Sequence, residues 1–390
     1  MKIGRIVRLL TDTKRKELLN DVDEKRKIIV SIFYPADDSF KASRQGLYMD
    51  LFYPREDAFI KRFAGRQNKV GEPLSEDYLK GIKINTYNNA PISRSINKYP
   101  VIIYSPGLGM DRDSLIYIIE KLVSQGYVVI TVGHIYDSEF TIFPTGEVIH
   151  QAKNFDNASL EEKEQLVEIR KEDILFLIDE LEVINNEDTS VLGALDLNKL
   201  GVIGHSMGGA AVFKVAATDL RIKAVVLLDA ALHYVNLVKE INEGVLLNTP
   251  LLNFRKGSID YEEGMKKTIK HFAASSDGET FKRRIIMQDQ VLIRQKKGQK
   301  ELYEYLAGYK SFIKLKDSEH LTFTDLPIIY NQALENDVLP IPEAHEVISE
   351  ITVRFFNEFL CGIEADYRSF INSTSCPRIC MIDKHGKLVE

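Results

Sequence analysis

Features that are scarce or missing in this chain of 390 residues exclude several classes of protein. Cysteine is scarce: the odd count of three, all within the last thirty residues, argues against a disulfide framework and favours a reducing compartment. No uninterrupted apolar run reaches about 18 residues, the length that a membrane-spanning helix needs. The first ten residues carry charges within a short apolar stretch, unlike a secretory signal. We therefore expect a cytoplasmic protein, although a chain that had lost a leader would look the same.

Positive charge is not in excess, because 51 basic and 57 acidic residues give a net charge of −6. This balance provides no bulk attraction to nucleic acid or to an anionic membrane, so we expect no nucleic-acid partner. Internal repeats and low-complexity segments are also missing. The cysteines lack further ligands at zinc spacing, and we expect no metal site among the residues near the end of the chain: Cys361, Cys376, Cys380 and His385.

The chain does contain the pentapeptide Gly204-His205-Ser206-Met207-Gly208, which matches the pattern G-x-S-x-G. It ends the apolar run 200–204 and precedes a helix-like segment at 210–217. This context is typical of a nucleophile elbow, a strained strand-to-helix turn that exposes a serine hydroxyl above the sheet. A positive φ at the serine leaves no space for side chains two positions before or after it, which explains the glycines. Ser206 is therefore the candidate nucleophile.

Strand-like and helix-like segments alternate from about residue 100 onward. Short, continuous apolar runs predict strands buried on both faces of a parallel sheet, at 99–105, 127–132, 200–204, 224–228, 250–254 and 311–315. Amphipathic spacing predicts three helices. One spans 115–125, one follows a capping box of Ser159 and Glu162, and one spans 342–360. The alternation predicts an α/β protein with a doubly wound, mostly parallel central sheet and helices on both faces.

The first hundred residues follow a different pattern, in which the segments 3–10 and 27–34 predict an antiparallel hairpin that starts the sheet. We interpret residues 1–390 as one domain with insertions at about 36–98 and 256–309 that cap the site or line its pocket. The first insertion holds an aromatic and apolar cluster that would suit an acyl pocket or a lipid contact: Leu47, Tyr48, Phe52, Tyr53, Phe59, Ile60 and Phe63. A helix packed on its own core has the same pattern, and we favour that interpretation.

A serine at an elbow needs a base, and in this arrangement the base is a histidine later in the chain. The chain has eight histidines, and only His320 stands a few residues beyond an apolar strand that follows Ser206. His233 and His271 lie in insertions, where a structural role is the more common one. We expect His345 and His385 at the surface, the first within the last helix and the second in the polar tail.

The acid that orients the base comes between the serine and the histidine in chain order. Asp229 directly follows the strand-like run 224–228, at the carboxyl edge of the sheet where active-site groups gather. Asp317 is the rival acid, but it shares a loop with His320 and would need a tight local turn to reach the ring. Asp229 is therefore the preferred candidate.

Two backbone N–H groups should stabilise the oxyanion of the reaction. One is that of Met207, the residue after the nucleophile, and the other comes from the turn 106–109, with Leu108 as the expected donor. The glycines of that turn also match half of a dinucleotide fingerprint. Arg112 stands where the third glycine would be, so we expect no nucleotide and no other cofactor.

Four segments, 104–109, 204–209, 227–230 and 318–323, together resemble the platelet-activating factor acetylhydrolase group of α/β hydrolases, which comprises plasma and type II intracellular enzymes and bacterial relatives. The resemblance implies the α/β-hydrolase fold and cleavage of short-acyl (phospho)lipid or related esters. It also implies roles for single positions: Ser206 as nucleophile, Asp229 as acid, His320 as base, and Leu108 and Met207 as oxyanion-hole donors. Pro106 departs from the family, which usually has histidine there, so the acyl-chain preference is not carried over.

Two alternatives stay open beside a serine ester hydrolase of small-molecule or lipid esters. One is an α/β hydrolase of another substrate class, such as a lactone, a polyester or a peptide bond, although peptidases resembling prolyl oligopeptidase carry a repeat domain that is not visible here. The other is a non-catalytic scaffold, but such proteins usually lack a triad member and none is missing here. Transient contact with a lipid interface is equally open.

Overall fold

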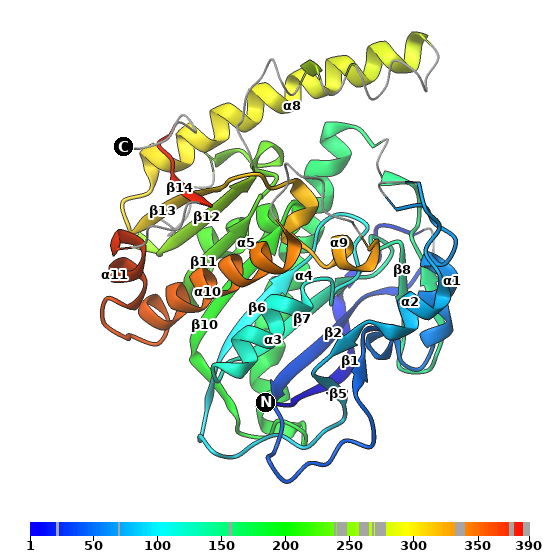
Figure 1. Cartoon of the computed structure of the whole chain (residues 1–390). Helices are drawn as coiled ribbons and strands as arrows, with labels where there is room; N and C mark the ends of the chain where they lie inside the picture. Colours follow the sequence, from blue (N-terminus) through cyan, green and yellow to red (C-terminus); the bar gives the residue numbers. More distant parts are fainter. Residues whose placement is uncertain are drawn as a thin grey trace.

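The structure, a computed structural model, describes residues 1–20, 23–68, 71–155, 158–237, 239, 248–256, 265–266, 269, 278–331, 340–373 and 378–384, without the side chains at 279–280, 283–284 and 305 (Figure 1). Parts of the second predicted insertion lie outside these residues. So do three residues discussed above: His271, Cys376 and His385.

The described residues form one ten-stranded sheet in the order β14-β13-β12-β11-β10-β6-β7-β2-β1-β5. Its strands are β1 (Ile3–Lys16), β2 (Lys25–Pro35), β5 (Thr86–Asn88), β6 (Tyr99–Ser105), β7 (Val128–His134), β10 (Leu195–His205), β11 (Ile222–Leu228), β12 (Leu251–Lys256), β13 (Lys310–Leu315) and β14 (Ile379–Met381). Six neighbouring strands of this sheet pair in parallel: β13, β12, β11, β10, β6 and β7. Antiparallel pairs join β1 to β2, β2 to β7 and β13 to β14. The predicted hairpin, the six predicted parallel strands and the doubly wound α/β class are confirmed.

Helices cover both faces of the sheet (Figure 1). Two pack on one face and two on the other: α3 (Ile116–Ser124) with α10 (Ile341–Phe359), and α4 (Leu160–Glu187) with α5 (Met207–Thr218). Val101 and Ile103 of β6 contribute to the core on the side of α4 and α5. Their neighbours Ile102 and Tyr104 contribute to the core on the other side. A strand buried on both faces needs an apolar residue at every position, which explains the unbroken apolar run.

The helix ends follow the local signals in the sequence. At the start of α4, the Ser159 hydroxyl accepts the Glu162 N–H at 3.1 Å, and the Glu162 carboxylate accepts the Ser159 N–H at 2.8 Å. This is the predicted capping box. The helix predicted at 342–360 is α10, and Gly362 follows it with a φ of 76°. A glycine in the left-handed region just beyond a helix is a common stop signal.

The first insertion folds into short elements over one end of the sheet (Figure 1). They are β3 (Gly46–Leu47), η1 (Tyr48–Phe52), α1 (Glu56–Phe63), α2 (Glu76–Gly81) and β4 (Lys83–Ile84). Its aromatic rings pack on one another: Phe59 lies 5.0 Å from Phe52, 5.2 Å from Phe63 and 5.6 Å from Tyr48, measured between ring centroids. All four side chains are buried. The packing interpretation of the cluster is therefore confirmed for these residues.

The remaining elements are β8 (Phe140–Ile142), β9 (Val148–His150), η3 (Leu232–Tyr234), α8 (Gly278–Tyr305), η5 (His320–Phe323), α9 (Leu326–Ile329) and α11 (Asp366–Ser373). The long helix α8, from the second insertion, runs past the β12 to β14 end of the sheet (Figure 1). Its Leu302 is buried in the core on the α4 and α5 side. Whether this insertion caps the site stays a prediction.

Candidate active site

Ser206 lies at a sharp turn between β10 and α5. Its φ is 53° and its ψ is −120°, a backbone conformation that costs a non-glycine residue on the order of 1–3 kcal/mol. A Cβ on Gly204 would lie 2.5 Å from the carbonyl oxygen of Gly208, and a Cβ on Gly208 would lie 2.1 Å from that of Ser105. Both contacts are with backbone, so glycine is required at both positions, as the sequence predicted.

Backbone hydrogen bonds tie this turn to the end of β11. The Ser206 N–H donates to the carbonyl oxygen of Leu228 at 3.1 Å, and the Ser206 carbonyl oxygen accepts the Ala231 N–H at 2.8 Å. Leu228 is the last residue of β11, and Asp229 comes directly after it. The turn and the candidate acid are thus held to the same few residues at the carboxyl edge of the sheet.

The structure brings the predicted base and the preferred acid together. Nδ1 of His320 and Oδ2 of Asp229 lie 2.6 Å apart, with the His320 side chain 36% exposed and that of Asp229 only 3%. Because the carboxylate accepts, the neutral ring carries its proton on Nδ1, and Nε2 keeps its lone pair. The remaining oxygen of Asp229 lies 3.4 Å from Nη1 of Arg255.

The electrostatics keep Asp229 ionised in spite of its burial. Burial opposes the charged form, but the Arg255 guanidinium and the hydrogen bond from His320 hold the pKa of the Asp229 carboxyl well below its usual range. An ionised carboxylate at this place favours a positive charge on the imidazole during proton transfer. The pair therefore has the arrangement of a general base with its orienting acid.

The rival acid, Asp317, faces elsewhere. Its side chain is 50% exposed and lies 3.4 Å from the guanidinium of Arg378. It shares the loop of His320, as the sequence showed, and its φ is 54°, but the carboxylate that contacts the imidazole is that of Asp229.

His205, which directly precedes Ser206, contacts the loop that carries His320. Its ring centroid lies 4.6 Å from that of His320, and its Nε2 donates to the carbonyl oxygen of His320 at 3.1 Å. Burial, together with the neighbouring His320, lowers the pKa of His205 to about 3, so this ring is neutral. Sequence reasoning passed over this residue because it looked for the base only among the histidines that follow the serine. We interpret His205 as a support for the His320 loop.

The expectation that His345 lies at the surface is wrong. Its ring is buried, stacks on Tyr117 with 3.5 Å between centroids, and places Nε2 3.2 Å from the carbonyl oxygen of Thr322. Burial lowers the pKa of His345 to about 4. The face of α10 that carries His345 packs toward α3 and η5, so a polar residue there is buried and bonded rather than solvated. It therefore stabilises the segment that follows His320.

The predicted oxyanion donors have free backbone N–H groups. Among the backbone hydrogen bonds of the described residues, none has the Leu108 or the Met207 N–H as its donor. Met207 is the first residue of α5, and a first-turn N–H has no partner within its own helix. The helix dipole adds partial positive charge there, which favours an anion at this point.

A buried arginine fixes the direction of the Leu108 N–H, and sequence reasoning missed it. Arg170 of α4 donates from Nη1 to the carbonyl oxygen of Pro106 at 2.5 Å and from Nη2 to that of Gly107 at 3.2 Å. Its guanidinium also forms two hydrogen bonds, of 2.7 and 2.5 Å, with the carboxylate of Asp137, and both side chains are 1% exposed. In a planar trans peptide the C=O and N–H point in opposite directions. Holding the Gly107 carbonyl toward Arg170 therefore turns the Leu108 N–H away from it.

We expect Arg170→Lys to lower kcat for ester hydrolysis by about 100-fold with a smaller change in KM, because a misplaced oxyanion donor weakens the transition state in particular. A lysine keeps the charge but cannot bond both carbonyls and Asp137 at once. Arg26→Lys is the matched control, since Arg26 is equally buried and bonds Asp173 of the same helix but no residue of the 106–109 turn. Both variants should lose stability in thermal melts. Equal losses of kcat in the two would contradict the positioning role.

The other polar candidates that the structure describes do not gather into a second site. Cys361 and Cys380 are free thiols, and Cys361 lies 3.2 Å from the Tyr127 hydroxyl. His233 is buried beside Tyr234 and Gln295. Within the described ranges, no group of three or more His, Cys, Asp or Glu side chains has an arrangement that would hold a metal ion. No helix in that part of the chain is long and apolar enough to cross a membrane.

Comparisons with known proteins agree on one family. The family model described as platelet-activating factor acetylhydrolase, isoform II, matches residues 15–359. The chain is 30% identical over 168 residues to the platelet-activating factor acetylhydrolase of Cavia porcellus, which covers 38% of each protein. It is 28% identical over 134 residues to the probable 1-alkyl-2-acetylglycerophosphocholine esterase of Arthroderma benhamiae, covering 34% of this chain and 32% of that protein. The chain thus matches less than half of the length of these curated relatives.

A solved structure supports the fold over nearly the whole chain. The ferulic acid esterase from Streptomyces cinnamoneus superposes with a TM-score of 0.68 at 20% sequence identity, covering 98% of this chain and 96% of that one. At this identity the likeness concerns the fold alone. Together with the mixed, mostly parallel sheet, it identifies the α/β-hydrolase fold that the sequence predicted.

Proposed function

Because this chain belongs to the family of platelet-activating factor acetylhydrolase, isoform II, we propose that it is a serine hydrolase of carboxylic esters. The observation that carries the proposal is the 2.6 Å hydrogen bond between His320 and Asp229 at the sheet edge where Ser206 occupies its strained turn. The free N–H groups of Leu108 and Met207 at the same edge support it.

In the proposed mechanism, Nε2 of His320 accepts the proton of the Ser206 hydroxyl while its Oγ attacks the ester carbonyl carbon. The carbonyl oxygen becomes an oxyanion that accepts hydrogen bonds from the Leu108 and Met207 N–H groups. His320 then gives its proton to the leaving alcohol, and an acyl-enzyme on Ser206 results. Water attacks this ester by the same route and releases the acid. Asp229 stabilises the imidazolium in both halves of the reaction.

We propose short-acyl esters, including short-acyl phospholipids, as the substrate class. The relatives named as acetylhydrolases and as an alkylacetylglycerophosphocholine esterase support an acyl group of acetyl size.

Hydrolysis of p-nitrophenyl esters, from acetyl to dodecanoyl, tests the proposal when wild type and Ser206→Ala are compared in the presence of EDTA. We expect serine-dependent activity that is highest for the shortest acyl groups and is unaffected by the chelator. Activity restricted to lactones, polyesters or peptides would keep the serine mechanism and replace the substrate class. A protein without activity on any of these compounds would be the non-catalytic scaffold.

A further inference from the structure

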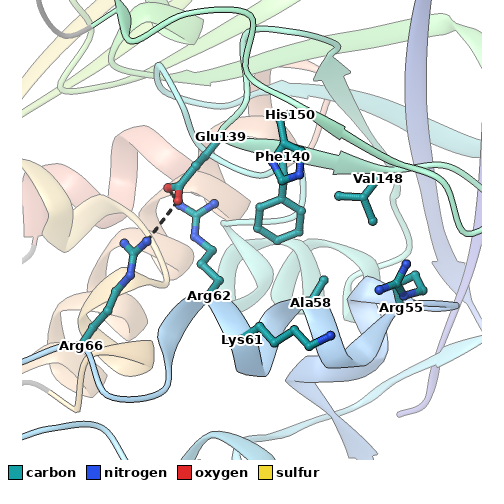
Figure 2. Close-up of a pocket in the computed structure, with 9 residues that line it drawn as sticks. All are labelled: Arg55, Ala58, Lys61, Arg62, Arg66, Glu139, Phe140, Val148 and His150. Atoms are coloured by element: carbon teal, nitrogen blue, oxygen red, sulfur yellow. Dashed lines mark hydrogen bonds and ion pairs between the residues drawn. The ribbon is translucent and has the colours of Figure 1, made fainter.

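A pocket of about 440 Å³ lies between α1 and the hairpin of β8 and β9, and no step of the proposed reaction uses it (Figure 2). Volumes of this size are typical of small-molecule sites. The β8 strand follows the carboxyl end of β7, which runs parallel to β6 and β10. The pocket therefore lies at the same edge of the sheet as Ser206, and its first wall comes from the insertion at 36–98.

Positive charge dominates the lining of this pocket. Four basic side chains line it, against one carboxylate, that of Glu139: Arg55, Lys61, Arg62 and Arg66. A second carboxylate, Asp57, lies outside the lining and pairs with Arg55 and Lys61, at 2.9 Å each. These four cations outnumber the three carboxylates that act on them, those of Glu139, Asp57 and Asp111, so the pocket keeps an excess of positive charge in a chain whose net charge is −6. Such a local excess attracts anions.

The Glu139 side chain shows where an oxyanion fits. Its two carboxylate oxygens pair with two different guanidinium groups, one with Arg62 and the other with Nη2 of Arg66 at 3.1 Å (Figure 2). Arginine forks of this kind bind carboxylate and phosphate groups in the same geometry. Nε of Arg62 is buried and has no hydrogen-bond partner among the described residues. The guanidinium therefore has donor capacity that Glu139 does not use.

The pocket also has an apolar surface. Phe140 of β8 points toward α1, with Ala58 of α1 and Val148 of β9 beside it (Figure 2). The guanidinium carbon of Arg62 lies 5.1 Å from the centre of the Phe140 ring, so charge and apolar surface are adjacent. A free inorganic anion would leave this surface uncovered. An anion carried on an aryl or alkyl group would cover it.

The wall of the pocket is joined to the oxyanion turn. The Glu139 N–H donates to the carbonyl oxygen of Gly109 at 3.0 Å, and the Gln151 N–H donates to that of Glu139 at 3.1 Å. Gly109 directly follows Leu108. The backbone of Glu139, whose side chain lines the pocket, is therefore hydrogen-bonded to the residue that follows a proposed oxyanion donor.

We propose that this pocket binds a small anionic amphiphile, a phosphate or carboxylate group carried on an aryl or short alkyl group. The oxyanion contacts Arg62 and Arg66, in the place that the Glu139 carboxylate takes in this structure. The apolar group covers Phe140 and Val148. This site is additional to the proposed hydrolase site, since none of its lining residues belongs to the Ser206, Asp229 and His320 set.

Isothermal titration calorimetry on the protein tests the site with two probes, phenyl phosphate and 3-phenylpropionate. The probe that binds with the lower Kd identifies the preferred oxyanion. Neither probe is a carboxylic ester, so binding is measured independently of ester hydrolysis. We expect saturable binding that weakens at least about tenfold in Arg66→Gln, which loses a charged hydrogen bond. Glu139→Gln should act in the opposite direction and tighten binding, because it removes the competing carboxylate. A role in folding alone would not give opposite signs.

Arg221→Gln is the matched control variant, because Arg221 is 46% exposed and paired with a carboxylate, much as Arg66 is 43% exposed and paired. It should bind both probes as the wild type does. Benzyl alcohol and inorganic phosphate are the control ligands, each lacking one half of the proposed ligand. The site is refuted if neither probe binds, if Arg66→Gln binds them unchanged, or if either control ligand binds as tightly as the probes.

Discussion

Ser206→Ala is expected to lower kcat for ester hydrolysis by about four to six orders of magnitude, the effect of removing a nucleophile from a unit of this kind. The substitution removes one oxygen and keeps a non-glycine residue at the φ of 53°, so the strain of the turn is unchanged. Circular dichroism and thermal melts should therefore match the wild type. The turnover of p-nitrophenyl acetate provides the measurement, and His320→Ala should give a loss of similar size.

Ser105→Ala provides a matched control for this result. The Ser105 hydroxyl lies 3.0 Å from Nε2 of His134, whose Nδ1 lies 2.9 Å from the carboxylate of Asp173. These contacts link the same three chemical groups as the proposed triad, but Ser105 is 0% exposed and no substrate reaches it. We expect a loss of about 1 kcal/mol in stability and less than a tenfold loss of kcat. Retention of a tenth of the activity by Ser206→Ala would refute its role.

Asp229→Asn is expected to lower kcat by about four orders of magnitude, while Asp317→Asn leaves it within about twofold. An amide at position 229 can present its NH₂ group to Nδ1, which would move the ring proton to Nε2 and remove the lone pair that accepts the serine proton. Asp317 is half exposed and pairs with Arg378, so its loss should have little effect on the imidazole. Steady-state kinetics of the two purified variants separate these expectations.

The reverse result would make Asp317 the acid and would mean that the loop carrying His320 rearranges when substrate binds. Equal and small losses in both variants would remove the carboxylate from the mechanism. Thermal melts are needed beside the kinetics, because Asp229 also lies 3.4 Å from Arg255 and its replacement leaves that buried cation with less compensation.

Much of the fold and the place of the candidate site could be predicted from the sequence because their causes are local. The apolar run 99–105 had to be a strand buried on both faces, and its alternate residues do enter two different cores. Gly204 and Gly208 are required by backbone contacts within a few residues of Ser206. Asp229 and His320 follow β11 and β13, whose carboxyl ends lie at the same edge of a parallel sheet, so the sequence could place both residues at that edge.

Contacts between distant segments could not be predicted in the same way. Arg170 lies in an amphipathic helix, and the periodicity of that helix does not distinguish a buried guanidinium from a solvated one. Its partner Asp137 and its acceptor Gly107 come from two other segments. His345 was misplaced for the same reason, since its burial depends on Tyr117 and on the loop after His320. The cationic pocket likewise requires α1 and the β8–β9 hairpin to meet.

Covalent labelling with a fluorophosphonate, mapped by peptide mass spectrometry, would decide whether Ser206 is the nucleophile. The reagent reacts with a serine that a neighbouring base has activated, and it needs no knowledge of the substrate. We expect a single adduct on Ser206 in the wild type and none in His320→Ala, with Ser105 unlabelled in both. An adduct on another serine, or an unlabelled Ser206 in the folded wild-type protein, would contradict the proposed serine hydrolase.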